Sequence, residues 1–97
     1  MYQIEYTQNA LNDLKWFEKH EQKVIVQAID TQLSYEPTVP TRNRKPMRPN
    51  PLGAWELRVG EFRVLYDVSE TVQIVEIERI GQKRGNQFFF RGNQEEL

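Results

Sequence analysis

The chain has 97 residues, 38% of them hydrophobic, and a net charge of −1, a size and composition typical of one globular domain. It contains no cysteine and a single histidine, His20, which excludes disulfides, thiolate metal sites and catalysis by a cysteine or a pair of histidines. Any catalysis must use Arg, Lys, Glu, Asp or Tyr. We therefore expect one domain over residues 1–97, without a metal or another cofactor.

The start of the chain, MYQIEYTQ, has no basic segment and no apolar run, and no stretch approaches the roughly 18 apolar residues of a membrane span. We therefore expect a cytoplasmic protein that does not bind a membrane. The charge is unevenly distributed, because residues 42–91 hold ten Lys and Arg against six Asp and Glu, whereas the rest of the chain is acidic. This asymmetry predicts a positive face on a slightly acidic protein.

The first segment, YQIEY at 2–6, alternates apolar and polar side chains, which is the period-2 pattern of a half-buried strand. Apolar residues then recur at three-residue spacing as far as Phe17, which predicts an amphipathic helix capped by Thr7 or Asn9. These patterns predict a strand followed directly by a helix.

A second apolar stripe runs from Val24 to Leu33 and predicts another amphipathic helix. His20 and Glu21 are expected to form the short connection between the two helices. The second helix should end before Pro37, because proline disfavours helical geometry in the residue that precedes it. Together the two helices are expected to form an antiparallel hairpin.

Residues 37–53, PTVPTRNRKPMRPNPLG, contain all five prolines of the chain and are expected to form a mostly irregular loop on the surface. A loop of this length in a small domain tends to be functional or disordered. Its basic residues, which favour a function, are Arg42, Arg44, Lys45 and Arg48. A solvated basic loop without chemistry is the alternative that the residues leave open.

The remaining strands are expected at 54–59, 62–68 and 72–80, with a final segment near 87–91. A two-residue loop between the first two of these strands sets Arg58 opposite Arg63, because loop length determines the pairing. Like charges placed directly opposite each other are unfavourable. The pair must therefore be neutralised by neighbouring acids or hold an anion.

The next hairpin allows two registers. A two-residue loop at 70–71 places Val75 and Ile77 on the core face, whereas a three-residue loop would bury Glu76 and Glu78 there. We take the two-residue loop, because burying unpaired carboxylates is costly. This register sets Glu78 beside the two arginines on the open face of the sheet.

Two interpretations of these arginines remain open. Glu78 and Glu56 can neutralise Arg58 and Arg63 in surface ion pairs, each worth about 0.2–1 kcal/mol. Alternatively, the planar guanidinium groups, held rigidly on strands, can bind a phosphate through two hydrogen bonds each.

Two blocks, WELRVGEFRVLYDV at 55–68 and IGQKRGNQFFFRG at 80–92, follow the strand, the helical hairpin and the basic loop. In this order, across essentially the whole chain, they resemble the RelE/ParE superfamily of bacterial toxins from type II toxin–antitoxin systems. The resemblance implies an α+β fold, in which an N-terminal strand and a helical hairpin pack on one face of a four- to five-stranded, mainly antiparallel sheet. It also implies a cognate antitoxin as partner.

The resemblance implies one of two activities: cleavage of mRNA on the ribosome, or inhibition of DNA gyrase. Cleavage requires that the ribose 2′-hydroxyl be deprotonated, the charged phosphorane stabilised and the leaving 5′-oxygen protonated. By the resemblance, Arg63 is the strand arginine that holds the phosphate, and either Lys83 or Arg84 is the basic residue near the end of the last long strand. Glu56 and Lys45 are the candidates for the base, although Glu56 would be a weak base beside two arginines.

The sequence departs from RelE-like enzymes at three places. Ala54 and Glu56 stand where those enzymes often carry lysines, and Phe89 stands where they often carry a tyrosine. We expect Phe88 and Phe90 to face the core and Phe89 to face the open side, where it can stack on a base but cannot transfer a proton. The expected RNA-binding residues are Arg58, Lys45, Arg44, Arg48 and Phe89.

The first functional hypothesis is therefore a ribosome-dependent mRNA endonuclease with the ribosome and mRNA as partners. A gyrase inhibitor is the second, favoured by the missing lysines and tyrosine, and a degenerate antitoxin-binding module is the third. All three require an exposed apolar groove for the antitoxin. The neighbourhood of Trp16 and Phe17 is a candidate for it, with ordinary core packing as the favoured alternative for these two side chains.

Overall fold

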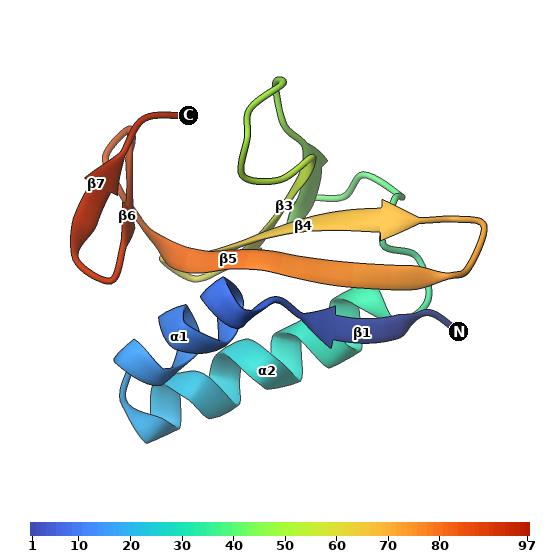
Figure 1. Cartoon of the computed structure of the whole chain (residues 1–97), viewed down its shortest axis with the longest axis horizontal. Coiled ribbons are helices and arrows are strands. Elements are labelled where there is room, and N and C mark those ends of the chain that lie inside the picture. Colours follow the sequence, from blue (N-terminus) through green and yellow to red (C-terminus); the bar gives the residue numbers. More distant parts are fainter.

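Two helices cover one face of a seven-stranded sheet in the computed structural model, which describes residues 1–97 (Figure 1). The helices are α1 (Gln8–Trp16) and α2 (Lys19–Leu33), and the strands are β1 (Gln3–Tyr6), β2 (Arg44–Pro46), β3 (Trp55–Val59), β4 (Phe62–Ser69), β5 (Ile74–Arg84), β6 (Gln87–Phe90) and β7 (Asn93–Glu95). The predicted α+β class is confirmed. The sheet has more strands than expected because the three-residue strands β2 and β7 extend its two ends.

The long strand β5 organises the sheet. Its neighbours run in the order β2-β3-β4-β5-β6-β7, and β1 also pairs with β5. Residues 74–77 of β5 pair in parallel with β1, whereas residues 82–84 pair antiparallel with β6. Both β1 and β6 pair with the same edge of β5, but at different positions along the strand. Residues 78–81, which lie between these positions, therefore lack a strand partner on that edge.

The main core lies between the helices and the sheet. Its fully buried members come from both layers and include Ile25, Ile29, Leu33, Leu57, Val64, Tyr66, Val75, Ile77 and Ile80. The expected burial of Val75 and Ile77 is thus confirmed. A smaller cluster of Leu65, Phe88 and Phe90 packs with Met47 and Leu52. Neither helix has the length and apolar character needed to cross a bilayer.

The helix boundaries agree with the predictions in part. Thr7 caps α1, where the backbone N–H of Ala10 donates to its hydroxyl at 3.0 Å. The expected connection at His20 and Glu21 is wrong, because α2 already begins at Lys19. Glu18 and Glu21 form a reciprocal capping box there, which satisfies backbone donors that the first turn of a helix leaves free.

The first predicted hairpin register is confirmed, and Arg58 pairs with Arg63. The second is wrong. Arg63 pairs with Gly81, and the strands shift register between Leu65 and Tyr66, so that Glu78 is an extra residue in β5. The bulge and a longer turn over 70–73 keep the core faces as predicted, yet they remove Glu78 from the arginines. A bulge of one residue is not visible in an alternating pattern.

Glu78 instead lies near the carboxyl groups of Glu76 and Asp67. Burial, followed by hydrogen bonding with these two neighbours and repulsion from them, raises the pKa of Glu78 to about 8. Its proton is therefore held more tightly in the folded chain than in the unfolded chain. In the predicted register Glu78 would neutralise the arginine pair, whereas in the observed register it does not.

The predicted faces of the phenylalanine segment are reversed. Phe88 and Phe90 pack with Leu65 on the side of the sheet away from the helices, whereas Phe89 pairs with Gln82 and faces the other side. The ring of Phe90 crosses Gly81 so closely that a Cβ there would lie 2.5 Å from a ring carbon. A glycine inside a strand marks such a close approach, and this signal in IGQKRG could have revealed the arrangement.

Asp13 of α1 fills the gap in the edge of β5. Its carboxylate is fully buried and accepts a hydrogen bond from the backbone N–H of Ile80 at 3.0 Å. Nε of Arg79 lies 2.7 Å from one carboxylate oxygen, and Nε of Arg91 lies 2.9 Å from the other. The guanidinium of Arg79 also lies 4.4 Å from the centre of the Phe90 ring. One carboxylate thus joins α1, β5 and the turn between β6 and β7.

We expect Asp13→Asn to lower the free energy of unfolding by about 3 kcal/mol, the lower end of the range for breaking a buried ion pair, because Arg91 stays partly exposed. Urea unfolding followed by circular dichroism measures the change. Asp30→Asn, at an exposed position of α2, is the matched control and should change it by less than about 0.5 kcal/mol. Equal stability of the two variants would contradict the role given to Asp13.

Glu78 should make the folded state less stable as the pH rises. Its pKa in the folded chain, about 8, exceeds the usual value, so the folded state binds more protons between about pH 4.5 and 8 and stability falls over that interval. Glu78→Gln should remove this slope and melt at a higher temperature than the parent chain at pH 8.5, but not at pH 4. Thermal melts at both values test this, and parallel pH profiles for the two proteins would refute it.

Candidate functional site

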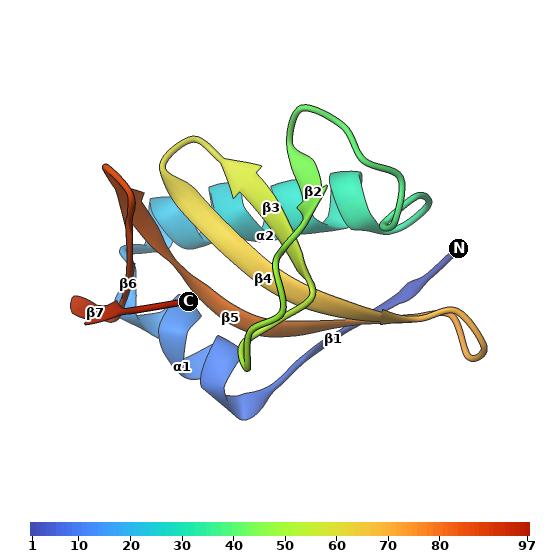
Figure 2. The same ribbon diagram turned by 90° about the horizontal axis from the view of Figure 1, so that it is seen from above.

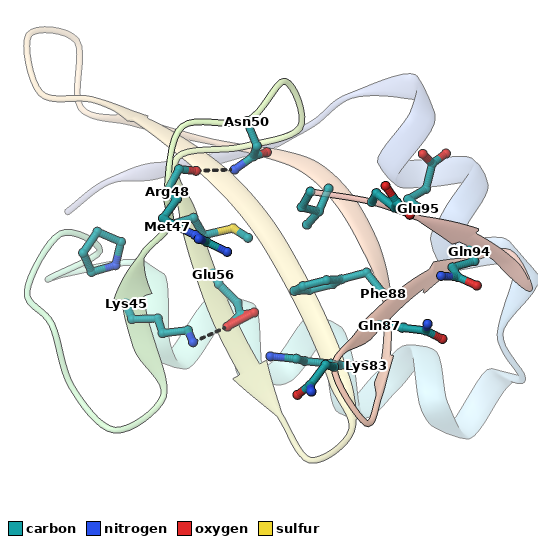
Figure 3. Close-up of a pocket in the computed structure, with 14 residues that line it drawn as sticks. Lys45, Met47, Arg48, Asn50, Glu56, Lys83, Gln87, Phe88, Gln94 and Glu95 are labelled. Atoms are coloured by element: carbon teal, nitrogen blue, oxygen red, sulfur yellow. Dashed lines mark hydrogen bonds and ion pairs between the residues drawn. The ribbon is translucent and has the colours of Figure 1, made fainter.

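The face of the sheet opposite the helices is hollow. The chain between β2 and β3 rises on one side of the hollow, and the β6–β7 hairpin rises on the other (Figures 1 and 2). A cavity of about 730 Å³ lies here, and its lining includes Lys45, Arg48, Glu56, Lys83, Phe88 and Glu95 (Figure 3). This volume is in the range of pockets that bind small ligands.

A smaller pocket of about 100 Å³ adjoins the cavity and shares three of its residues, Lys45, Glu56 and Lys83. No hydrophobic residue lines it. Its full lining is Arg42, Asn43, Lys45, Glu56, Arg58, Arg63 and Lys83. Five basic side chains surround one carboxylate, so we call this space the positive pocket. Its surplus of positive charge favours binding of an anion such as a phosphate.

Arg63 is the most rigidly held of these basic residues. Its side chain is only 8% exposed, and its Nη1 donates to the carbonyl oxygens of Gly60 at 2.7 Å and Phe62 at 2.9 Å. Burial lowers the pKa of Arg63 below its usual value, Glu56 opposes that shift, and Arg58 adds to it. Arginine nevertheless keeps its charge in proteins. The result is a fixed cation at the end of the first hairpin.

Glu56 is the buried carboxylate that lies beside the cations of Arg63 and Lys45. It is 3% exposed, and its Oε1 is 3.8 Å from Nε of Arg63. Its Oε2 is 3.5 Å from Nζ of Lys45 (Figure 3). Lys45 stands directly opposite Glu56 in the β2–β3 pairing and remains 61% exposed. Oε1 has no hydrogen-bond donor within the chain. Glu56 therefore orients the two cations while Lys45 extends into the pocket.

The two basic residues near the end of β5 point to opposite faces. Lys83 lines both pockets, and its Nζ lies 5.3 Å from the centre of the Phe88 ring. Arg84 lines neither pocket, and its guanidinium instead lies 6.0 Å from the centre of the Phe89 ring. Successive side chains of a strand alternate between its faces, so only one of the two can belong to the pocket, and it is Lys83.

Two other residues that the sequence placed at the site lie elsewhere. Phe89 is on the opposite face of β6, as described above. Arg44 is buried, and its Nε donates to the carbonyl oxygen of Val39 at 3.1 Å while its Nη1 donates to the carbonyl oxygen of Gln32. Arg44 therefore anchors the basic loop to the end of α2 rather than facing the pocket.

Sequence reasoning missed the contribution of the β6–β7 hairpin. Gln87 and Glu95 line the larger cavity, yet β7 has only three residues and no alternating apolar pattern. Two signals were available, because Gly85 and Gly92 both have positive φ and close the turns on either side of β6. The chain has no group of three or more His, Cys, Asp or Glu residues placed to hold a metal ion.

Solved structures of known proteins share this fold. The toxin–antitoxin complex RelBE2 from Mycobacterium tuberculosis contains a chain with 28% identity and a TM-score of 0.73, and the match covers 84% of this chain and 98% of that one. A chain of the archaeal RelE–RelB complex from Pyrococcus horikoshii has 22% identity and a TM-score of 0.68, with 87% and 96% covered. The isolated RelE toxin of E. coli has 17% identity and a TM-score of 0.66, with 88% of each chain covered.

No protein with a curated function matches the chain. The sequence model of the ParE toxin of type II toxin–antitoxin systems matches residues 4–86. These residues span β1 to the turn before β6 and include every residue of the positive pocket, whereas the β6–β7 wall of the larger cavity lies outside the match. The chain therefore belongs to the ParE toxin family, within the RelE/ParE superfamily of type II toxin–antitoxin toxins.

Proposed function

We propose that this toxin cleaves mRNA on the ribosome in the cytoplasm, without a metal ion, and that a cognate antitoxin neutralises it. The observation that carries the proposal is the positive pocket, where Arg63 and Lys83 line one space with Lys45 and surround a single carboxylate. A phosphate with its RNA backbone is the ligand whose size and charge suit this pocket.

Arg63 and Lys83 stabilise the transition state in this proposal. Attack by the ribose 2′-hydroxyl on the neighbouring phosphorus produces a doubly charged phosphorane. Cations that are already held in place stabilise that charge without reorganisation. Arg63 meets this requirement because three groups of the chain orient it: the carboxylate of Glu56 and the carbonyl groups of Gly60 and Phe62.

Lys45 is the better candidate for the proton acceptor. It is 61% exposed, whereas Glu56 is almost fully covered, so Lys45 can reach the 2′-hydroxyl and can accept its proton once the ammonium has given its own proton to water. The proton passes to Lys45, the bond from phosphorus to the 5′-oxygen breaks, and the ammonium of Lys83 donates a proton to that oxygen. The products are a 2′,3′-cyclic phosphate and a free 5′-hydroxyl.

None of the four tyrosines lines either pocket, so no phenol supports the proton transfers. We therefore expect slow chemistry that depends on the ribosome to place the mRNA. Positioning of reacting groups can account for a large part of a rate enhancement. Free RNA lacks the positioning that the ribosome supplies, so it should be a poor substrate.

A second candidate function is inhibition of DNA gyrase by binding, without chemistry. The match to the ParE family model favours it, as do Ala54 and Glu56 at the places where RelE-like enzymes often carry lysines. In that case the positive pocket would be a protein-binding or vestigial surface. A degenerate toxin that only binds its antitoxin is the third possibility.

An antitoxin partner is supported by the relatives, because the proteins from M. tuberculosis and P. horikoshii were solved as complexes with their antitoxins. In this chain Trp16 is 50% exposed at the end of α1, and Val24 is 50% exposed on α2. Phe17 is buried and packs edge-to-face on Phe62, with 5.3 Å between ring centres. We therefore assign the antitoxin contact to Trp16 and the exposed side of the helices, without Phe17.

Arg63→Ala should abolish mRNA cleavage, because it removes the fixed cation of the pocket. Primer extension on a reporter transcript after brief induction in cells measures cleavage as new 5′ ends in the translated region. We expect at least a hundredfold loss of these ends, comparable to the loss of one transition-state donor. Arg84→Ala is the matched control, since it removes the same charge outside the pocket, and it should cleave normally.

Growth arrest with intact transcripts in the parent chain would reject the nuclease proposal, and DNA damage signalling in the same cells would then identify gyrase as the target. Normal cleavage by Arg63→Ala would show instead that the nuclease site lies elsewhere. Neither arrest nor cleavage would leave the degenerate module as the explanation.

Glu56→Gln should strengthen anion binding, because it removes the only negative charge from the small pocket. A change of roughly 1 kcal/mol corresponds to about fivefold tighter binding of inorganic pyrophosphate, measured by isothermal titration calorimetry at low salt. Glu5→Gln, on an exposed position of β1, is the control and should bind as the parent does. Weaker binding by Glu56→Gln would mean that orienting the cations matters more than the charge of the carboxylate.

A further inference from the structure

Three side chains of different chemistry form a row across the larger cavity. Lys83 of β5 pairs with Phe88 of β6, and Phe88 pairs with Glu95 of β7. Residues paired across strands project to the same face of a sheet, and all three line the cavity (Figure 3). The row therefore begins with the cation of Lys83 at the positive pocket and ends with the carboxylate of Glu95 on the far wall of the larger cavity, which the β6–β7 hairpin forms.

The far wall is not engaged within the chain. Glu95 and Gln87 line the cavity there, and neither side chain takes part in an ion pair or a hydrogen bond of the folded chain. The cavity thus offers unused hydrogen-bond acceptors opposite a cationic edge.

A ribonucleotide has the complementary arrangement, with an anionic phosphate at one end and a base that carries hydrogen-bond donors at the other. Phe88 is only 9% exposed, because Phe90 stacks against it with 6.3 Å between ring centres. It therefore provides an apolar floor rather than an open stacking surface. The cavity volume of about 730 Å³ leaves room for a base and its ribose.

We propose that this cavity is a base-binding subsite, in which Glu95, assisted by Gln87, accepts a hydrogen bond from the exocyclic amino group of a nucleobase while Lys83 contacts the adjoining phosphate. The proposal rests on the proposed nuclease function and specifies its substrate. A carboxylate can only accept hydrogen bonds, and adenine, cytosine and guanine carry amino groups that uracil lacks. The toxin should therefore bind a base that carries an exocyclic amino group more tightly than the same base without it, next to the phosphate that Arg63 holds.

The subsite affects only ligands that join a base to the phosphate, as RNA does. Inorganic phosphate can occupy the Arg63 pocket without reaching Glu95, so the two parts of the site can be tested separately. Matching oligonucleotides isolate the amino group: a pentamer of uridines with one central adenosine, and the same pentamer with an unsubstituted purine in that position. Both carry 2′-O-methyl groups throughout, so that binding is measured without cleavage.

Fluorescence anisotropy at low salt should show that the parent chain binds the adenosine pentamer roughly tenfold more tightly than the purine pentamer, as expected for one hydrogen bond to a charged acceptor. Glu95→Ala should reduce this ratio to about one while leaving the affinity for the purine pentamer unchanged or higher. Glu5→Ala, an exposed acidic position on β1 outside the cavity, should keep the full ratio.

Each other outcome has a distinct meaning. If the parent chain binds both pentamers equally, or if Glu95→Ala keeps the tenfold ratio, the subsite proposal is wrong while the nuclease proposal stands. If the parent chain binds neither pentamer but Arg63-dependent cleavage is seen on ribosomes, the subsite is again wrong, because the cavity then has no affinity of its own. If it binds neither and cleaves nothing, both proposals fall together.

Discussion

The buried carboxylate of Asp13 is the interaction on which the arrangement of the concave face depends. Strand β5 is paired by β1 at one end and by β6 at the other, and Asp13 binds the backbone of Ile80 in the gap between them. Through Arg91 the same carboxylate holds the turn between β6 and β7, and its other partner, Arg79 of β5, contacts the Phe90 ring of β6. That hairpin is one wall of the larger cavity, so a residue of α1 on the far side of the sheet determines where the wall stands.

The pocket itself is governed by a second constraint, the crowding of positive charge. Arg58 and Arg63 face each other directly, and Lys45 and Lys83 line the same small pocket. Such repulsion must be offset within the folded chain or by a ligand. Glu56 offsets part of it, since it approaches both Arg63 and Lys45. One carboxylate among five cations leaves a remainder that favours binding of an anion.

Much of the fold could be predicted from the sequence, because its determinants are local. The alternation in YQIEY, the two apolar stripes and the two-residue hairpin loop specified their elements and the pairing of Arg58 with Arg63. The errors arose at two places where a single residue decides the outcome. The bulge at Glu78 shifted the pairing of β5, and the close approach of Phe90 to Gly81 reversed the faces of β6. Neither feature produces a periodic pattern in the sequence. The burial of Asp13 is likewise not visible in the sequence, because its partners Arg79 and Arg91 are far from it along the chain.

The structure also changes how the missing lysines are understood. Glu56 occupies a place where RelE-like enzymes often carry a lysine, which by itself argues against catalysis. However, the register of the sheet sets Lys45 of β2 directly opposite Glu56, and its Nζ lies 3.5 Å from the carboxylate. Lysine side chains are long and flexible enough to bring their charge to a pocket from a neighbouring strand. A basic group therefore reaches the same pocket from the edge strand β2, which offsets the absence of a lysine at position 56 of β3.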